Sequence, residues 1–430
     1  MAFGEWQKRV LGGANRLMSQ LGVPIAVDFG CASLKVLQIQ GTETPSLVAA
    51  AALPTPEDLL HDHAKRLTFQ IEALPKLIKS CGIKTKRAVC AIPSSQSFIR
   101  HLQLTLEPGG STTALVKAAL AQQLNCDPNG LVLRHIEVGQ VGRTNKTEVI
   151  CMAAARDLVG RLMDALKAAK LEPVGMHMEC IAAIRAFDSI TRREEDKNLT
   201  SLYLDMGAGT TNLMIAHGRD LVFTKNLPIG GRDLDATAAR QLKVELKDAR
   251  AERLKLAEIA PRPAAAATAE AKPAASGMAM LAAAMAKAGS PMNDNGAADT
   301  AVMEDRRTGQ PAPGLTPELT RQPKVDFVGP KVDLTEVVES LTDEIAGCLR
   351  YHESVFPDRR VTRAIFMGGE SRHLGLAQHI ARTLRLPAQV ADPMASVGRT
   401  GKEETPGVDF HRQQPGWAMV LGLCMSPTDL

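Results

Sequence analysis

Aromatic residues are scarce in this chain of 430 residues, which has two Trp, two Tyr and ten Phe. Proteins that bind single-stranded nucleic acid stack the bases on exposed aromatic rings, and few such rings are available here. The formal net charge is only +4, so the concentrated basic face that is typical of nucleic-acid binders is not expected either. The composition therefore argues against a nucleic-acid partner.

Metal-binding cysteine patterns and long apolar runs are also missing from the sequence. None of the eight Cys forms a CxxC pair, and none combines with His at a zinc-site spacing. Several lie inside apolar runs, which is typical of reduced core residues in a cytosolic protein. No apolar run approaches the length that spans a bilayer. We expect a cytoplasmic globular protein that is long enough for two or more domains.

A Gly-rich turn between apolar strands is the first positive signal. Residues 202–204 are typical of the end of a buried strand, and Asp205 follows at its carboxyl end. A tight turn of small and hydroxyl residues comes next, made of Gly207, Ala208, Gly209, Thr210 and Thr211. Glycines let backbone N–H groups converge on one point, which favours anions, and an Asp at the rim suits a hydrated Mg²⁺. The stretch predicts a phosphate-binding turn.

One such turn is weak evidence, because most Gly-rich turns are ordinary hairpins. A second copy lies 177 residues earlier, where the turn is made of Gly30, Cys31, Ala32 and Ser33. At this constant offset the segments match as Asp28 with Asp205, Gly30 with Gly207, Ser33 with Thr210 and Gly41 with Gly218. Lys35 is either a point charge for the same phosphate or a solvated strand lysine. Two similar turns indicate two similar subdomains with a phosphate held between them.

Three further segments carry candidate site residues, each with a structural alternative. Glu179 begins a helix, where an acid usually complements the helix dipole, but it could instead orient a water that attacks a phosphate. Glu252 and Lys255 lie on a predicted helix, and the alternative for them is a solvated charged face. Gly368 and Gly369 follow a predicted buried strand, and they suit the close approach of backbone to a flat ligand such as adenine.

The rest of the chain predicts a modular organisation. Residues 83–175 alternate as β–β–α–β–β–α, which indicates a small α+β insert rather than a continuation of the first sheet. Residues 261–330 are rich in Ala, Pro and Gly and predict a disordered, surface-exposed insertion. Residues 1–22 mix apolar and basic side chains, and we favour a helix packed on its own domain or a frayed tail over a membrane-binding helix.

Taken in order, these segments resemble the actin-like ATPases, which include actin, DnaK-type chaperones, sugar kinases, MreB and FtsA. Five motifs match in sequence order: the phosphate-1 turn at 28–35, the connecting helix at 179–184 (ExxAA), the phosphate-2 turn at 205–211, the ribose-contacting helix at 251–255 (AExxK) and the adenosine turn at 367–369. The resemblance implies an α/β, actin-like ATPase fold in which two ribonuclease-H-like subdomains surround a nucleotide cleft.

Within this superfamily the chain is most similar to the FtsA/PilM branch, and in it to the type IV pilus assembly protein PilM family. The similarity covers residues 24–425 apart from the insertion, and the α+β block lies where PilM and FtsA carry subdomain 1C. Two departures are the insertion after Lys255 and Cys31, which stands where a small hydroxyl residue is usual. The implied domains are an N-terminal tail (1–22), subdomain 1A (23–82 and 176–200), subdomain 1C (83–175), subdomains 2A and 2B (201–260), the insertion (261–330), and a return through 2A to 1A (331–430).

The resemblance also implies roles for the candidate residues. Asp28 and Asp205 would hold Mg²⁺ through water, and Glu179 and Asp205 would be the catalytic candidates. The phosphates of ATP would be held by Gly30, Cys31, Ala32, Ser33, Lys35, Gly207, Ala208, Gly209, Thr210 and Thr211. The nucleoside would contact Glu252, Lys255, Gly368 and Gly369.

The implied function is a cytoplasmic ATP-binding scaffold at the inner face of the inner membrane. It would bind the N-terminal peptide of a PilN-like protein in a nucleotide-dependent way, with weak or no ATP turnover, and it would be peripheral to the membrane through such partners. A type II secretion platform is the alternative machine, and self-association stays open.

Two other functions remain as alternatives. An FtsA-like polymerising division protein ranks second, because such a protein is expected to carry an amphipathic membrane helix at its C-terminus, and the residues after the predicted apolar helix at 417–425 do not show one. A small-molecule kinase of the same fold ranks third, because it would need a substrate acid and specificity loops that the sequence does not show.

Overall fold

The computed structural model of the chain describes residues 22–83, 85–107, 109–124, 127–188, 194–254, 314–322, 324 and 332–428. Most of the predicted tail at 1–22, most of the predicted insertion at 261–330, and Lys255 lie outside the described residues. Within the described part of the chain, no helix combines the length and the apolar character of a membrane span.

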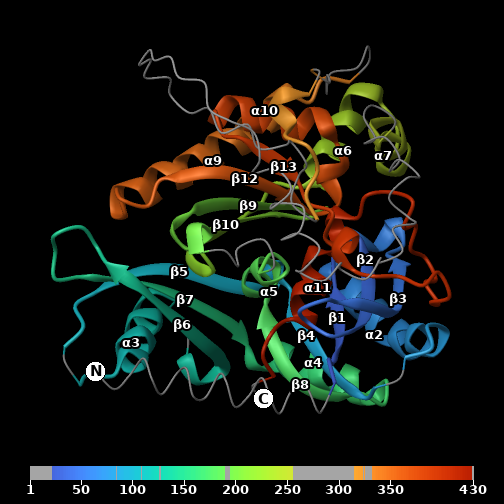
Figure 1. Cartoon of the computed structure of the whole chain (residues 1–430), viewed down its shortest axis with the longest axis horizontal. Coiled ribbons are helices and arrows are strands. Elements are labelled where there is room, and N and C mark those ends of the chain that lie inside the picture. The colour runs from blue at the N-terminus through green and yellow to red at the C-terminus, as the bar shows by residue number, and fades with distance from the viewer. Residues whose placement is uncertain are drawn as a thin grey trace, which may run out of the picture. The chain divides into compact units, whose positions relative to one another are not determined.

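The first sheet contains five strands in the order β3-β2-β1-β4-β8. Strands β1 (Ile25–Phe29), β2 (Ser33–Gln40) and β3 (Ser46–Pro54) form an antiparallel meander, as the hairpin pattern of the sequence predicts. Strands β4 (Arg87–Ile92) and β8 (Glu172–Met178) extend the sheet in parallel from β1 (Figure 1).

The second sheet repeats this arrangement in the order β11-β10-β9-β12-β13. Strands β9 (Thr200–Met206), β10 (Thr211–His217) and β11 (Asp220–Leu227) form the antiparallel meander. Strands β12 (Val361–Met367) and β13 (Ala388–Val390) are the two parallel strands. The shared strand order and directions confirm the duplicated architecture that the two Gly-rich turns predict.

Helices cover both faces of the second sheet. Leu202 and Leu204 point to one face, where they join the core of α9 (Thr335–Val355) and α10 (Leu374–Leu384). Tyr203 points to the opposite face and belongs to the core of the first sheet. The period of two along a strand places neighbouring residues in these two different cores.

Two short helices lie between the sheets, namely α5 (Glu179–Arg185) and α11 (Ala418–Cys424), as Figure 1 shows. They approach so closely that a Cβ added to Gly422 would lie 1.7 Å from the carbonyl oxygen of Ala182. The contact requires small residues where the two helices meet, because any side chain at Gly422 would separate the two backbones. The contact fixes the N-terminus of α5, which carries Glu179.

The first sheet is covered by α2 (His63–Ser80) and α4 (Arg156–Ala168), whose buried leucines join the core of β1 and β4. The predicted insert at 83–175 therefore differs from the structure at both ends. Strand β4 belongs to the first sheet, because a parallel strand needs a crossover and α2 supplies it. Helix α4 packs on the first core as well, so the insert proper is shorter than predicted.

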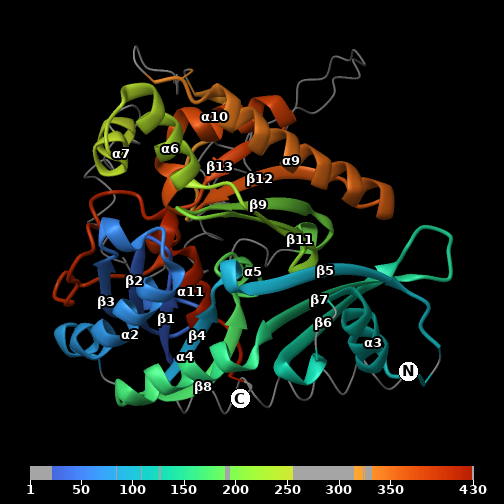
Figure 2. The same ribbon diagram turned by 180° about the vertical axis from the view of Figure 1, so that it is seen from behind.

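The insert proper is a third sheet in the order β5-β7-β6. It consists of β5 (Ser97–Leu104), β7 (Thr147–Ala155) and β6 (Leu131–Gln140), with α3 (Thr112–Leu124) beside them. Figure 2 shows it on the side of the first sheet away from β3.

A polar cluster joins this third sheet to the second half of the chain. The ring nitrogens of His101 lie 2.8 Å from Glu148 Oε1 and 3.0 Å from the carbonyl oxygen of Thr224 on β11. Tyr351 on α9 donates its hydroxyl proton to Glu148 Oε1 at 3.1 Å, and burial and Glu148 raise the pKa of the Tyr351 phenol to about 12. The insert is therefore bonded to the second half through both β11 and α9.

The structure also differs from the predicted insertion at its C-terminal end. Residues 314–322 fold onto the second half, where Leu315 forms a bridge with Ala391 and Leu319 is buried in the core. Their backbone is tied down by hydrogen bonds such as Thr316 N–H to the carbonyl oxygen of Val390. The Ala- and Pro-rich composition that motivates the prediction ends before this stretch.

Candidate functional site

A cavity of about 480 Å³ opens between the two halves, and its size is typical of small-molecule sites. Both Gly-rich turns line it, together with the start of α5, the end of β12 and part of the segment that leads into α11. The two halves thus contribute equivalent elements to one site.

Asp28 and Asp205 occupy equivalent positions in the two sheets, and both line the cavity. The residue opposite Asp28 in the β1–β2 register is Lys35, whose Nζ lies 3.4 Å from Asp28 Oδ2. The residue opposite Asp205 in the β9–β10 register is Asn212, whose Nδ2 donates to Asp205 Oδ2 at 3.2 Å. One aspartate is therefore balanced by a charge and the other by an amide.

Asn212 is a site residue that the sequence prediction missed. Its Nδ2 also donates to Glu179 Oε2 at 3.2 Å, so one amide group contacts two carboxyl groups. Its Oδ1 accepts a hydrogen bond of 2.6 Å from Asn226 on β11, which fixes the orientation of the amide. The signal that could have found it is the offset of 177 residues, which places Asn212 opposite Lys35 in the repeat.

Glu179 lies among these like charges, and its pKa is raised to about 7. Burial is the largest cause, and the charges of Asp28 and Asp205 add to it, while hydrogen bonds from Ser94 oppose it. Burial also raises the pKa of Asp205, against the effects of Asn212 and Lys35. The described residues include no group of three or more His, Cys, Asp or Glu side chains placed to hold a metal ion.

The two turns meet at their tips. A Cβ added to Gly209 would lie 3.4 Å from both Cys31 Sγ and Arg232 Nη2, which is an ordinary van der Waals contact and shows how near the two tips are. Nine of the predicted phosphate contacts line the cavity, namely Gly30, Cys31, Ala32, Ser33, Lys35, Gly207, Ala208, Gly209 and Thr210. Thr211 does not, because it is buried in β10 and donates its hydroxyl proton to the carbonyl oxygen of Ile229.

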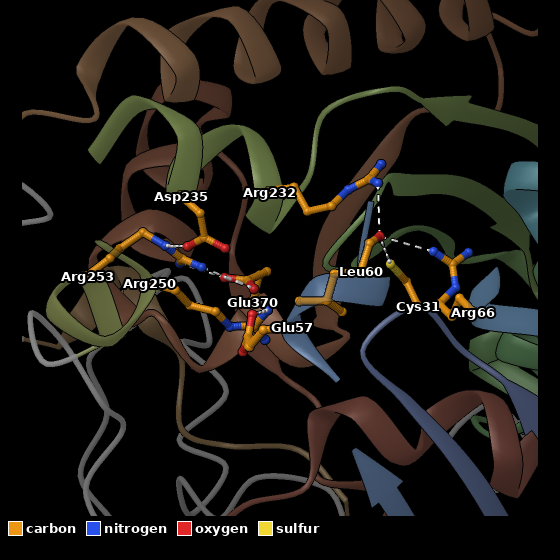
Figure 3. Close-up of polar contacts among 9 residues, drawn as sticks. All are labelled: Cys31, Glu57, Leu60, Arg66, Arg232, Asp235, Arg250, Arg253 and Glu370. Carbon is orange, nitrogen blue, oxygen red and sulfur yellow. Dashed lines mark hydrogen bonds and ion pairs between the residues drawn. The ribbon is translucent and has the colours of Figure 1, made fainter. Parts of the chain in front are cut away.

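Gly368 and Gly369 line the cavity at the end of β12. Gly368 has φ of 86°, and a Cβ there would lie 2.4 Å from the carbonyl oxygen of Met206. Both the backbone angle and the space therefore require glycine at this position. The turn is held from behind by Arg253, whose Nη1 lies 2.7 Å from Glu370 Oε2 (Figure 3).

Helix α7 (Leu246–Leu254) presents a different face to the cavity from the one that the sequence predicts. Arg250 and Leu254 line the cavity, whereas Glu252 is exposed and is not among the lining residues. The phase is set by Arg253, which is fully buried in ion pairs with Asp235 at 2.6 Å and with Glu370. Around the helix, residues 250 and 254 lie on the same side of Arg253, and Glu252 lies on the opposite side of it.

The sequence and fold of the chain are similar to those of known proteins. A family model described as type IV pilus assembly protein PilM matches residues 26–264, and one described as cell division protein FtsA matches residues 202–408. No curated protein matches the chain. Among solved structures, a PilM–PilN type IV pilus biogenesis complex is similar with a TM-score of 0.65 and 18% identity over 95% of this chain and 100% of that chain.

Two other solved structures show weaker similarity. The ethanolamine utilization protein EutJ of Carboxydothermus hydrogenoformans has a TM-score of 0.44 and 14% identity, with 96% of each chain covered. The MreB5 protein of Spiroplasma citri bound to ADP has a TM-score of 0.42 and 10% identity, over 93% of this chain and 94% of that chain.

The raised pKa of Glu179 predicts a pH-dependent stability. The carboxyl group is protonated in the folded protein up to about pH 7, whereas the ordinary pKa of a glutamate carboxyl is 4.5. Its stabilising contribution is therefore complete below about pH 4.5 and is lost as the pH rises through about 7. Glu179→Gln, which keeps a neutral group, should exceed wild type in free energy of unfolding by about 3 kcal/mol at pH 8, and by about 1 kcal/mol or less at pH 5.

Urea unfolding without nucleotide or Mg²⁺ measures this difference. Glu172→Gln is the matched control, because Glu172 is an exposed acid at the start of the strand that leads to Glu179. The control should show no pH-dependent difference from wild type. A difference between Glu179→Gln and wild type that is equal at both pH values would contradict the raised pKa of the Glu179 carboxyl.

Proposed function

The chain belongs to the type IV pilus assembly protein PilM family and has the actin-like ATPase fold, and we propose that it is a nucleotide-gated scaffold of a pilus assembly platform. The observation that carries this proposal is the pair of equivalent turns, each with a buried or half-buried aspartate, that face one cavity from the two halves. A ligand that bridges the two turns would couple its own binding to the closure of the cleft.

The ligand that fits this site is ATP with Mg²⁺. Asp28, Glu179 and Asp205 place excess negative charge beside the turns, which suits a divalent cation. Magnesium retains most of its waters in proteins, so Asp28 and Asp205 would hold it through water. When bound, the cation neutralises phosphate charge, and the protein residues orient the nucleotide around it.

The turn residues that line the cavity would hold the phosphates. Backbone N–H groups from Gly30 to Ser33 and from Ala208 to Thr210 would donate to phosphate oxygens, with Lys35 as the point charge. The N–H of Gly207 closes the second turn by donating to the carbonyl oxygen of Thr210. Gly368 and Gly369 would contact the nucleoside. Arg250 lines the cavity on the predicted ribose helix, and it takes the place that the sequence assigns to Glu252.

Turnover should be slow in this arrangement. Glu179 is the candidate group to orient a water, and Asn212 holds its carboxyl group through a hydrogen bond. A carboxyl group with a pKa of about 7 is only partly ionised at neutral pH. The same Asn212 bond restrains the side chain, so Glu179 is better suited to sensing a nucleotide than to rapid hydrolysis.

The partner would be the N-terminal peptide of a PilN-like inner-membrane protein. Support comes from family membership and from the similar fold of a PilM–PilN complex. Such a partner would place the chain at the cytoplasmic face of the inner membrane, either in a pilus platform or in a related type II secretion platform. Self-association is compatible with this role.

Replacing Asp205 should weaken binding of ATP with Mg²⁺. Asp205→Asn keeps the shape of the side chain but removes one negative charge beside the proposed cation. The dissociation constant measured by calorimetry should rise by about 10- to 100-fold in the presence of Mg²⁺. In EDTA, wild type and variant should bind equally weakly.

Asp220→Asn is the matched control, because Asp220 is an exposed aspartate at the start of β11, directly after the β10–β11 turn. It should bind ATP as wild type does. If Asp205→Asn also retains wild-type affinity, the site is assigned to the wrong residues.

Partner binding should depend on the nucleotide. An immobilised peptide of a PilN-like N-terminal tail should capture more wild-type protein with ATP and Mg²⁺ than without nucleotide. At an ATP concentration that saturates wild type but lies below the dissociation constant of the variant, Asp205→Asn should be captured near the nucleotide-free level, because it then loads little ligand. Equal capture of wild type with and without ATP would argue against a nucleotide-gated adaptor.

The same preparation distinguishes the two alternative functions. Sedimentation of the protein after ATP addition would favour an FtsA-like filament. Transfer of the terminal phosphate to a small molecule would favour a kinase of the same fold.

A further inference from the structure

A group of cationic side chains converges beside the tips of the two turns, on the carbonyl oxygen of Leu60 (Figure 3). Arg66 of α2 donates from Nη1 to this oxygen at 3.2 Å. Arg232 of α6 (Gly231–Leu242) donates from its own Nη1 to the same oxygen, also at 3.2 Å. Since α2 belongs to the first half and α6 to the second, one neutral acceptor joins guanidinium groups from both halves.

The cluster lies directly against the proposed phosphate site. Cys31 Sγ in the first turn is 3.9 Å from the same Leu60 oxygen. Arg232 Nη2 donates to the carbonyl oxygen of Gly209, in the second turn, at 3.5 Å. Arg66, Cys31 and the neighbouring His63 all line the cavity. Arg66 and His63 therefore border the space that the two turns enclose. Arg232 is not among the lining residues and lies against the second turn, beside Gly209.

These guanidinium groups lack anionic partners among the described residues. Neither Arg66 nor Arg232 forms an ion pair there, although Arg66 is only 3% exposed. Arg66 Nη2 instead lies 2.9 Å from His63 Nδ1, and Arg232 Nε is buried with no hydrogen-bond partner in the described structure. Arg66 is buried and Arg232 is half-buried, and bringing two like charges together there without an anion is costly, so the site lacks a counter-charge.

Two neighbouring arginines, Arg250 and Arg253, do have carboxylate partners. Arg253 is fully buried and contacts the carboxylates of Asp235 and Glu370. Arg250 lies 3.9 Å from Glu57, an ion pair that crosses from α7 to the first half. The pair of Arg66 and Arg232 differs from these in having only neutral acceptors, which points to an anion supplied from outside the described chain.

His63 is consistent with a strongly positive site. Burial lowers the pKa of its imidazole, and the charges of Arg66 and Arg232 lower it further. The neutral ring can accept the hydrogen bond from Arg66, and the positive charge of the site rests on the two arginines.

We propose that Arg66 and Arg232 bind the terminal phosphate of a nucleoside triphosphate and thereby distinguish a triphosphate from a diphosphate. This inference rests on the proposed nucleotide site and adds its discriminating residues. Guanidinium groups form paired hydrogen bonds with phosphate oxygens, and the two arginines reach the site from different halves. Only the triphosphate would then link the two halves through this cluster.

Calorimetric titration of the full chain with ATP and with ADP, each with Mg²⁺, tests the assignment. In Arg232→Gln the affinity for ATP should fall about tenfold, whereas the affinity for ADP should change less than about twofold. Arg232→Lys restores the charge without the planar fork and should recover part of the ATP affinity. Arg66→Gln, if its melting temperature matches wild type, should repeat the ATP-specific loss.

The matched control is Arg240→Gln. Arg240 is an exposed arginine of the same helix, and its side chain donates to Thr237 rather than to the cleft. It should leave both affinities unchanged, which excludes a general effect of removing positive charge from α6.

Three results would overturn the inference. Equal losses of ATP and ADP affinity in Arg232→Gln would show that Arg232 only holds the halves together. Unchanged affinities for both nucleotides in Arg232→Gln and Arg66→Gln would show that neither arginine contacts the phosphate. Binding of inorganic phosphate alone that depends on Arg232, with an unchanged ATP-to-ADP ratio, would assign the cluster to a free anion. Wild type that binds neither nucleotide would overturn the proposed function itself, whereas an altered ratio with both nucleotides bound supports both proposals.

Discussion

The carboxyl groups of Asp28, Glu179 and Asp205 lie close together in one cavity, and most features of this part of the cleft follow from keeping them compatible. Lys35 balances Asp28, and the amide of Asn212 contacts both Asp205 and Glu179. The remaining charge repulsion is relieved because Glu179 holds a proton up to about pH 7. A divalent cation at this place would offset the repulsion between the three carboxyl groups. Cation binding and the ionisation of Glu179 are therefore coupled in our proposal.

Backbone packing holds these groups at the required positions. Gly422 lets α11 contact α5 at the backbone, which fixes the end of β8 and with it Glu179. Gly368 lets the β12 turn pass directly over Met206 and Asp205, and the buried pair of Arg253 and Glu370 anchors that turn to α7. The site is therefore built on rigid contacts within each half, and contacts such as those of Arg232 join the halves at its edge.

The repeat explains which parts of this site are predictable from the sequence. Asp28 and Asp205 were found because a constant offset links two turns, and the strand order confirms the duplication. Asn212 follows from the same offset, but an amide inside an apolar strand carries no signal by itself. Thr211 shares the composition of the turn, yet it belongs to β10, because turn boundaries are not fixed by composition.

The remaining errors come from contacts between distant residues. Strand β4 was assigned to the insert because nothing local shows that a strand returns to a sheet after a crossover helix. Glu252 was assigned from the AExxK pattern. Arg250 was missed because the phase of α7 depends on burying Arg253, and a charged residue is expected to be solvated. Arg66 and Arg232 are far apart in the sequence, and only the folded chain brings them to Leu60.

The central claim is that a nucleotide with its triphosphate lies between the two turns, and alkylation of Cys31 tests it most directly. Cys31 is at the tip of the first turn and is only partly buried, whereas the other cysteines that the structure describes are buried. Saturating ATP with Mg²⁺ should slow the alkylation of Cys31 by about tenfold or more. The rate is measured by mass spectrometry of the peptide that contains Cys31. Mg²⁺ alone should not protect it. An alkylation rate that is the same with and without saturating ATP would contradict a triphosphate bound at the turns.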